Sequence, residues 1–238
     1  MNKEIEYLKK YYKGNLDDAI KKLNNGDAVQ YIVGNVDFYG YLINVDKRVL
    51  IPRRETEELV EEVIKRTKHF TNPTIIDVAT GSGCIAISIS KELNTKVYAS
   101  DISEDALKVA KENIKNNNAN VILFEGNMLE PYIKNNIKVD IIVSNPPYIM
   151  EDEKIEDIVK NNEPKIALYA KNNGLEYYEE ILKNASKILN NKFLIAFEIG
   201  QTQGKVIEEM AKKYIKNASV DILKDLSKKD RMLFVYNY

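Results

Sequence analysis

Residues that cross-link a chain or bind metals are scarce in this sequence. Its 238 residues include one cysteine, one histidine and no tryptophan. Cys84 alone cannot form an internal disulfide, and the lack of a disulfide framework fits a reducing compartment. Cys84 and His69 are together too few for a structural zinc site, so we expect no metal. We expect His69 to lie on the surface at the end of a helix.

Long apolar runs and an excess of either charge are also missing. No stretch approaches the roughly 18 apolar residues of a membrane span, and residues 1–6 have no apolar run behind them that would indicate a signal peptide. Lysine and arginine number 35, against 36 aspartates and glutamates, so no basic field indicates nucleic acid binding. We expect a cytoplasmic monomer that has no membrane partner and no direct nucleic acid partner.

The remaining composition is that of a globular protein, with 44% hydrophobic and 30% charged residues. The length suits one full α/β domain, or one domain with a small appendage. We place the appendage at residues 1–47 and the main domain at residues 48–238. Apolar residues three or four positions apart predict one or two helices over residues 4–23. The β-rich residues 30–34 and 36–45 predict a small hairpin.

Strand and helix patterns alternate from residue 73 onward, which is typical of α/β folds. The last two strands are joined by a short, helix-free link, so they should be antiparallel. The sequence thus predicts an α/β fold with a seven-stranded Rossmann-like sheet, an antiparallel last strand and a short N-terminal helical and hairpin segment. The expected strands are 74–79, 96–100, 121–124, 139–144, 192–199, 219–223 and 232–236. The expected helices are 58–67, 84–93, 103–116, 175–189 and 202–214, with one short helix in a polar, substrate-side loop between 148 and 164.

The most informative stretch is Asn145-Pro146-Pro147-Tyr148, which directly follows the apolar strand 139–144. Two consecutive prolines cannot continue a ladder because neither has a backbone N–H. The strand therefore ends at Asn145, at the edge where open α/β sheets bind ligands. The Asn145 side-chain oxygen and the Pro146 carbonyl are two acceptors for one planar –NH2 group, and the Tyr148 ring can lie flat against it. A simple strand-ending turn is the alternative.

A glycine-bearing turn, Gly81-Ser82-Gly83, follows the strand 74–79 and opens a helix, and Asp101 ends the next strand. Glycines let a ligand approach the backbone, and Asp101 can accept hydrogen bonds from ribose hydroxyls. This pattern serves a nicotinamide dinucleotide as well as another nucleoside cofactor. Asp101 could also do no more than cap the helix that begins near residue 103.

Three features argue against a dinucleotide-dependent dehydrogenase. Asp77 lies inside the first strand of the main sheet, where it can fix the turn or meet a cationic ligand such as a sulfonium amino acid. The antiparallel final hairpin resembles the methyltransferase sheet rather than the all-parallel dinucleotide fold. The Asn-Pro-Pro-Tyr stretch has no role in hydride transfer.

A series of motifs over residues 28–236, in order and with consistent spacing, resembles the bacterial peptide chain release factor glutamine methyltransferases, the HemK/PrmC family. The motifs are Gln30-Tyr31-Ile32-x-Gly34, Phe38-Tyr39-Gly40, Val49-Leu50-Ile51-Pro52-Arg53-x-Glu55-Thr56-Glu57, the 77–86 loop, Asn145-Pro146-Pro147-Tyr148-Ile149, Glu163-Pro164-x-x-Ala167-Leu168 and Asp225-Leu226-Ser227-x-Lys229-Asp230-Arg231. The resemblance implies a class I methyltransferase sheet. It also implies methyl transfer from S-adenosylmethionine to the glutamine amide in the Gly-Gly-Gln motif of class 1 release factors.

The resemblance also implies site residues by position. The glutamine would be held by Asn145, Pro146, Pro147 and Tyr148, of which all but Pro147 would be catalytic. Asp101 would bind the cofactor ribose. The residues expected to bind the cofactor are Asp77, Ala79, Thr80, Gly81, Ser82, Gly83 and Asp101, then Asn127 and Met128 beside the adenine, Arg53, Glu55 and Thr56 over its methionine end, and Asn145.

The sequence departs from the family pattern in a few places. Ala79 stands where the family usually has glycine, Arg54 replaces a common proline, and Met128 stands where some members have tryptophan. Residues 1–27 precede the first motif, where members usually carry several helices. An adenine amino-methyltransferase acting on DNA or RNA shares Asn-Pro-Pro-Tyr but normally needs a target-recognition segment and a basic face. A non-catalytic binding module would have no cofactor affinity.

Overall fold

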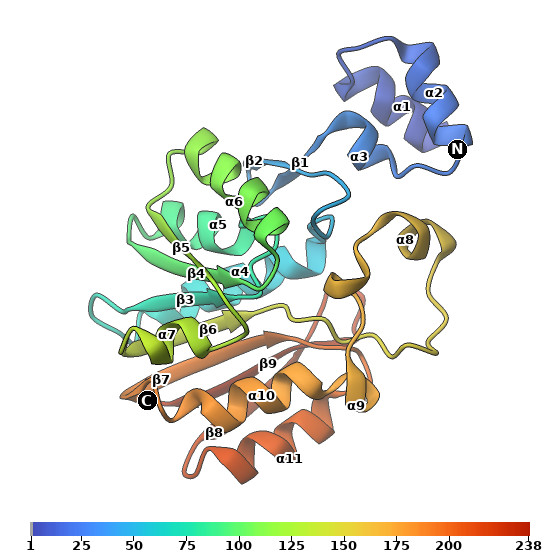
Figure 1. Ribbon diagram of the computed structural model, residues 1–238. Coiled ribbons are helices and arrows are strands. Elements are labelled where there is room, and N and C mark those ends of the chain that lie inside the picture. Colours follow the sequence, from blue (N-terminus) through green and yellow to red (C-terminus); the bar gives the residue numbers. More distant parts are fainter. Residues whose placement is uncertain (1) are drawn as a thin grey trace.

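The computed structural model describes residues 2–238, except for the side chain of Asn2. Its centre is a seven-stranded sheet in the order β5-β4-β3-β6-β7-β9-β8 (Figure 1). β9 is antiparallel to both of its neighbours, and the other paired strands are parallel. The predicted fold class, including the antiparallel last strand, is confirmed. The strands are β3 (Ile75–Val78), β4 (Val97–Asp101), β5 (Val121–Glu125), β6 (Val139–Ser144), β7 (Leu189–Glu198), β8 (Ser219–Lys224) and β9 (Asp230–Asn237).

Helices cover both faces of this sheet (Figure 1). One apolar core forms around Leu59 and Ile85, and the other around Tyr178 and Ile207 on the opposite face. Because the central strands are covered on both sides, they are apolar along nearly their whole length. The first face carries α4 (Arg54–Thr67), α5 (Cys84–Glu92) and α6 (Glu104–Asn116), and the second carries α7 (Glu130–Lys134), α10 (Glu176–Ala185) and α11 (Gly204–Tyr214).

The N-terminal segment contributes three helices and a hairpin. The helices α1 (Asn2–Tyr11), α2 (Leu16–Asn24) and α3 (Val29–Val33) share a small apolar cluster of their own. Of the one or two helices predicted over residues 4–23, two form, and the side-chain oxygen of Asn15 caps the second, α2. The hairpin of β1 (Asn35–Phe38) and β2 (Tyr41–Asn44) also forms as predicted. Its Phe38 and Ile43 belong to the core of the main sheet.

The prediction that residues 30–34 belong to the hairpin was wrong, because they form α3 instead. Gly34 closes this helix in the left-handed conformation, at φ 86°, which suits glycine. The Tyr31 hydroxyl donates a hydrogen bond to the Val49 carbonyl, at 2.6 Å. Such tertiary contacts override the β propensity of a short segment.

Two predicted boundaries also changed. α4 begins at Arg54 rather than at residue 58, since Glu55 and Glu57 favour the positive end of a helix dipole. The helix expected to reach residue 189 ends at Ala185, because Leu189 already pairs with Val139 at the start of β7. The other boundaries agree to within a few residues. No helix within residues 2–238 has both the length and the apolar character needed to cross a membrane.

The segment after the Asn-Pro-Pro-Tyr turn is largely ordered by contacts. It contains α8 (Asp157–Asn162), the 3-10 turn η1 (Lys165–Ala167) and α9 (Lys171–Gly174). α8 lies next to the N-terminal helices in Figure 1, and Asn162 connects the two regions. Its side chain accepts a hydrogen bond from the Ala28 N–H, at 3.1 Å, and donates one to the Gly26 carbonyl, at 2.8 Å.

Candidate active site

The Asn-Pro-Pro-Tyr turn lies where the sequence predicted, at the carboxyl end of β6. The last strand residue, Ser144, donates a hydrogen bond from its hydroxyl to the Val78 carbonyl on β3, at 2.7 Å. Pro146 and Pro147 are buried, so packing fixes the turn. Asn145 is left between two cavities and contributes to the wall of both.

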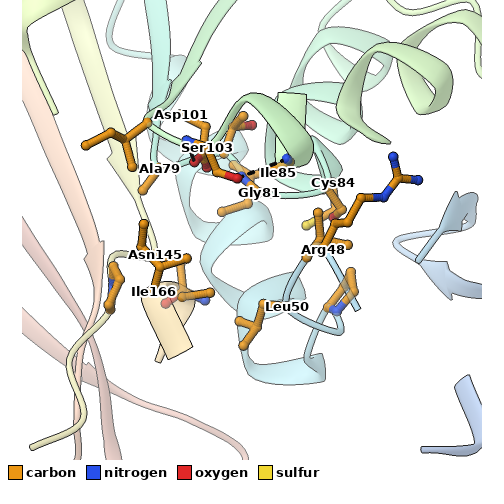
Figure 2. Close-up of a pocket in the computed structure, with 18 of the residues that line it drawn as sticks. Arg48, Leu50, Ala79, Gly81, Cys84, Ile85, Asp101, Ser103, Asn145 and Ile166 are labelled. Carbon is orange, nitrogen blue, oxygen red and sulfur yellow. Dashed lines mark hydrogen bonds between the residues drawn. The ribbon is translucent and has the colours of Figure 1, made fainter. Parts of the chain in front are cut away.

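The first cavity encloses about 880 Å³, part of it open to solvent. Figure 2 shows Gly81, Asp101 and Ser103 together at one wall and Asn145, Ile166 and Leu50 at another. The lining residues are Arg48, Val49, Leu50, Pro52, Thr56, Ala79, Thr80, Gly81, Ser82, Cys84, Ile85, Asp101, Ile102, Ser103, Ala106, Gly126, Met128, Asn145, Pro147, Ile166, Ala167 and Tyr177.

The turn between β3 and α5 exposes its backbone to this cavity. A Cβ placed on Gly81, which has φ 56°, would meet no atom within 4 Å, so a ligand can approach the chain there. Gly83, at φ 83°, has a packing role, because its Cβ would lie 3.3 Å from Cβ of Ala110. Ala79 adopts φ 58°, a conformation that costs an L-residue about 1–2 kcal/mol. Glycine at that position would relieve this strain.

Asp101 joins the glycine turn to the start of α6. One carboxylate oxygen accepts the Gly81 N–H at 2.8 Å, and the other accepts the Ser103 N–H at 2.9 Å. Ser103 caps α6 with its own hydroxyl, which accepts the Ala106 N–H at 3.2 Å. Asp101 therefore does more than cap the helix: it fixes the turn and forms part of the cavity wall. Burial raises the pKa of its carboxyl.

Asp77 lies behind the same turn and is fully buried. Its Oδ2 accepts hydrogen bonds from the Thr80 hydroxyl and from the Ala86 N–H, while Oδ1 has no hydrogen-bond partner among the described residues. Burial raises the pKa of this carboxyl to about 7, although both hydrogen bonds favour the charged form. A carboxyl poised near neutrality can become fully ionised when a cation binds nearby.

The second cavity lies on the other side of the Asn-Pro-Pro-Tyr turn. It shares Leu50, Asn145 and Ala167 with the first cavity, so the two meet at these residues. The other residues that line it are Arg53, Pro146, Tyr148, Ile149, Lys154, Ile155, Glu156, Val159, Leu168 and Glu198. Its floor is thus the predicted substrate motif, and its far wall is the segment that carries α8.

The structure brings together most of the residues predicted to bind the cofactor. Ala79, Thr80, Gly81, Ser82, Asp101, Thr56, Met128 and Asn145 line the first cavity, Asp77 lies behind the turn, and Gly83 ends that turn. Three residues lie elsewhere. Arg53 lines the second cavity and pairs with Glu163, Asn127 donates to the Glu180 carboxylate at 2.7 Å, and Glu55 lines neither cavity.

Sequence reasoning missed several residues that form the two cavities. Glu198 is the most notable, because it is a charged side chain only 2% exposed, at the carboxyl end of β7 and beside Asn145. An acidic residue that directly follows the apolar run 193–197 was a visible signal for it. Tyr177 and Ile166, which line the first cavity, lie far along the chain and carried no such signal.

Comparison with known proteins identifies the family. A family model described as "Methyltransferase small domain" matches residues 55–172. The release factor glutamine methyltransferase of Bacillus anthracis is 38% identical over 223 residues, which cover 91% of this chain and 79% of that protein. The protein of the same name from Bacillus subtilis is 40% identical over 215 residues, covering 87% and 75%. The chain belongs to the release factor glutamine methyltransferase family.

Among solved structures, a methyltransferase from Pyrococcus furiosus has a TM-score of 0.60 and 21% identity, covering 83% of this chain and 89% of that one. That likeness shows the fold alone. Membership of the release factor glutamine methyltransferase family confirms the resemblance found in the sequence and decides against a dinucleotide-dependent dehydrogenase. It also makes S-adenosylmethionine the cofactor, as predicted.

The first cavity fits S-adenosylmethionine on its own chemistry. Asp101 offers acceptor lone pairs at the wall for ribose hydroxyls, and the open backbone at Gly81 leaves room for a ligand. The buried Oδ1 of Asp77, which lacks a hydrogen-bond partner among residues 2–238, suits a ligand with a positive charge. Met128 and Ile102 supply apolar surface for a purine. These features are those that a cationic nucleoside requires.

The raised pKa of Asp77 predicts how the stability of the free protein depends on pH. The native state holds this proton more tightly than the unfolded chain between about pH 4 and about pH 7. Within that window the free energy of unfolding should fall with rising pH, by up to about 1.4 kcal/mol per pH unit from this group. Asp77→Asn, which cannot titrate, should show a shallower slope than the wild type in urea unfolding.

The matched control for this measurement is Asp37→Asn, at an exposed position of β1. Comparing the slopes of the three proteins isolates the contribution of Asp77 from that of the other carboxyls. Equal slopes in wild type and Asp77→Asn would contradict a carboxyl that titrates near neutrality.

Proposed function

We propose that this protein transfers a methyl group from S-adenosylmethionine to the side-chain amide nitrogen of the glutamine in the Gly-Gly-Gln motif of class 1 peptide chain release factors. One observation carries the proposal: Asn145 stands in the wall shared by two cavities. A methyl donor in the first cavity and an amide in the second meet at a side chain that can orient an –NH2 group.

The second cavity binds and orients the glutamine amide. The Asn145 side-chain oxygen and the Pro146 carbonyl accept its two hydrogens, and Tyr148 packs against its plane. The glutamine must enter as an extended side chain, which suits a cavity with apolar walls such as Ile149, Ile155 and Val159 and a polar end at Asn145. An amide is thus held at one end of the cavity, beside the first.

A neutral amide is a poor nucleophile, because its lone pair is delocalised. When bound, S-adenosylmethionine supplies an electrophilic methyl group. The acceptors at Asn145 and Pro146 turn the nitrogen lone pair toward the first cavity and stabilise the positive charge that develops on the –NH2 group. Placement of the two reactants supplies much of the remaining rate. The amide proton leaves after transfer, so this mechanism requires no general base.

The cofactor side is assigned in the same way. Asp101 holds the ribose, and the turn from Ala79 to Gly83 lies along the cofactor. Asp77, buried behind that turn, supplies a carboxyl near the charged end of the cofactor. Met128 packs on the adenine, and Thr56 lines the same cavity. Arg53, Glu55 and Asn127, which the resemblance also assigned to the cofactor, do not line this cavity and would have to rearrange to reach it.

The wider setting follows from the proposed reaction. Release factors act in translation, which places the enzyme in the cytoplasm, and the near-zero net charge of -1 accords with a protein rather than a nucleic acid substrate. We take the enzyme to be a monomer with an N-terminal segment of residues 1–47 and a methyltransferase domain of residues 48–238. The hairpin packs on the core of that domain, whereas α1–α3 keep a small apolar cluster of their own.

The proposal is tested by methyl transfer from labelled S-adenosylmethionine. The purified protein is offered a bacterial class 1 release factor, the same factor with its Gly-Gly-Gln glutamine replaced, and duplex DNA. We expect label on the first substrate only. Label on the replaced factor would show that a residue other than this glutamine is modified. Label on DNA would show that the enzyme is a nucleobase methyltransferase. No transfer to the intact factor, with cofactor binding shown separately, would overturn the proposal.

A further inference from the structure

An asparagine can guide an amine only if its own amide is turned the right way. The side chain of Asn145 has an acceptor oxygen at one corner and a donor –NH2 at the other, and the two are similar in shape. With the oxygen toward the substrate it accepts a hydrogen from the glutamine –NH2. With the –NH2 toward the substrate it would repel that group. Something in the protein must therefore choose between the two orientations.

The neighbours of Asn145 form a buried chain of hydrogen bonds. The Asn145 Nδ2 lies 3.2 Å from the hydroxyl oxygen of Thr56, on the first turn of α4. That hydroxyl lies 2.6 Å from Oε2 of Glu198, at the end of β7. Thr56 and Glu198 are each only 2% exposed, so water does not compete for these atoms.

The direction of this chain is fixed by counting hydrogens. A hydroxyl carries one hydrogen, and an ionised carboxylate carries none. When Glu198 is ionised, the Thr56 hydroxyl must therefore donate to it, and toward Asn145 the hydroxyl can only accept. Asn145 is obliged to turn its –NH2 to Thr56, so its oxygen faces away from Thr56 as the free acceptor. The conclusion does not depend on how the oxygen and nitrogen of Asn145 were assigned.

The other carboxylate oxygen of Glu198 holds the opposite end of the same motif. The Tyr148 hydroxyl lies 3.3 Å from Oε1 and within 3.5 Å of the Arg231 guanidinium. Arg231 in turn pairs with the buried Asp225, at 3.1 Å. Both ends of the Asn-Pro-Pro-Tyr turn are thus tied to Glu198, one directly and one through Thr56.

We propose that Thr56 and Glu198 are positioning residues that set the orientation of the Asn145 amide. The proposal rests on the function proposed above and assigns Thr56 to the substrate amide rather than to the methionine end of the cofactor. Burial raises the pKa of Glu198, against the hydrogen bond from Thr56 and the charge of Arg231, which favour its ionised form. The arrangement works when this carboxyl is ionised and acts only as an acceptor.

The first test compares Thr56→Val with Thr56→Ser. Valine has the shape of threonine without the hydroxyl, so Asn145 loses the partner that fixes its orientation, whereas serine keeps that partner. We expect kcat for release factor methylation to fall about tenfold in Thr56→Val, as for the loss of one hydrogen bond, and to stay within about twofold in Thr56→Ser. The Kd for S-adenosylmethionine should be unchanged in both.

The matched control is Thr67→Val, at the other end of α4, where the hydroxyl donates only to the Ile64 carbonyl. Its kcat should equal that of the wild type. If Thr56→Val raised the Kd for the cofactor and left kcat unchanged, Thr56 would be a cofactor-binding residue, and the proposal would be overturned. An equal loss of kcat in Thr56→Val and Thr56→Ser would also overturn it.

Glu198→Gln supplies the second variant, because a glutamine can donate to the Thr56 hydroxyl and free its hydrogen to point at Asn145. We expect a lower kcat and an unchanged Kd for the cofactor. Thr56→Val and Glu198→Gln remove the same chain of bonds, so the double variant should be no slower than the slower single variant, within about twofold. If the kcat losses of the two single variants multiplied in the double variant, the two residues would act separately, and the proposed chain of hydrogen bonds would be overturned.

Neutron crystal structures of the wild type, Thr56→Ser and Thr56→Val, which distinguish a deuterated –ND2 from an amide oxygen, separate this proposal from the proposed function. Asn145 should keep one side-chain orientation in the first two proteins and rotate, or adopt two orientations, in Thr56→Val. An unchanged orientation in Thr56→Val would overturn the positioning role. This readout needs no release factor, so it decides the role even if the wild type fails to methylate one, a failure that would count against the proposed function instead.

Discussion

Replacement of Asn145 by alanine should lower kcat for release factor methylation by roughly 10²–10³, the loss that follows removal of one polar group that stabilises a transition state. Asn145 is the polar side chain of the Asn-Pro-Pro-Tyr turn that lines both cavities. Alanine removes the side-chain oxygen that both orients the substrate amide and stabilises the positive charge developing on its nitrogen. Because both losses affect the transition state most strongly, kcat should fall more than the KM for the release factor rises.

The measurement is steady-state methyl transfer with saturating S-adenosylmethionine and a titrated release factor. Urea unfolding of the same variant should change little, because Asn145 is only partly buried and its replacement leaves the buried Pro146 and Pro147 in place. The cofactor should still bind, since Gly81 and Asp101 are untouched. A variant that retains the wild-type kcat would remove Asn145 from the reaction.

Asn191→Ala is the matched control. Asn191 is exposed near the beginning of β7, at the opposite end of the sheet from the cavities. The same substitution there should leave kcat and KM as in the wild type. A fall in kcat in Asn145→Ala but not in Asn191→Ala would show that the effect depends on the position of Asn145 and not on the loss of any asparagine.

The turn at Asn145 was predictable because its signals are local. An apolar run followed by two prolines determines where β6 ends, whatever the rest of the chain does. The position of that end relative to Gly81 and Asp101 follows from the parallel pairing of β3 with β4 and β6, which places all their carboxyl ends at one edge. Local patterns and one rule of sheet topology thus gave the centre of the cofactor site.

The wall between the cavities was harder to predict from the sequence, because it depends on how distant segments pack. Thr56 meets Asn145 only because α4, packed on one face of the sheet, brings its first turn to the carboxyl ends of the strands, and no spacing in the sequence reports that packing. Arg53 was predicted to reach the cofactor. Its guanidinium instead pairs with Glu163, since two charged groups brought together by the segment after β6 satisfy one another.

Asn127 illustrates the same limit on a smaller scale. Its position after β5 predicted a place beside the adenine, and its neighbours Gly126 and Met128 do line the first cavity. The backbone was therefore located correctly, but the side chain turns to Glu180 on α10. A side chain with a free rotamer follows its best hydrogen-bond partner, and that partner came from another layer of the fold.

The largest effect outside the two cavities is expected at Gly174, the last residue of α9. It has φ 77°, and a Cβ placed there would lie 2.1 Å from the Tyr148 carbonyl oxygen and 2.6 Å from Nε2 of Gln203. That carbonyl already accepts a hydrogen bond from Gln203, at 3.1 Å. Gly174 thus lets α9 pack directly on the backbone of the catalytic turn.

The backbone at Tyr148 has little freedom to yield to a larger side chain. The next residue, Ile149, donates its N–H to the Leu168 carbonyl at 3.0 Å and accepts the Ala170 N–H at 2.9 Å. The Tyr148 ring is held by its contact with Glu198. A methyl group at residue 174 must therefore displace the whole connection between the turn and α9.

Gly174→Ala should lower the free energy of unfolding by about 2–4 kcal/mol, combining left-handed strain with overpacking. It should also lower kcat at temperatures where the variant is folded, because Tyr148 and the substrate-facing end of the turn move. Gly40→Ala is the matched control, since Gly40 has a similar φ of 80° and no atom within 4 Å of its Cβ position. It should show only the strain, about 1–2 kcal/mol, with kcat unchanged.

Urea unfolding and methyl transfer on the same two variants separate backbone strain from the clash with Tyr148. A folded Gly174→Ala with wild-type kcat would mean that the Tyr148 carbonyl can move without consequence for the substrate amide. A loss of kcat confined to Gly174→Ala would instead show that α9, which contributes no residue to either cavity wall, fixes the backbone on which the glutamine is held.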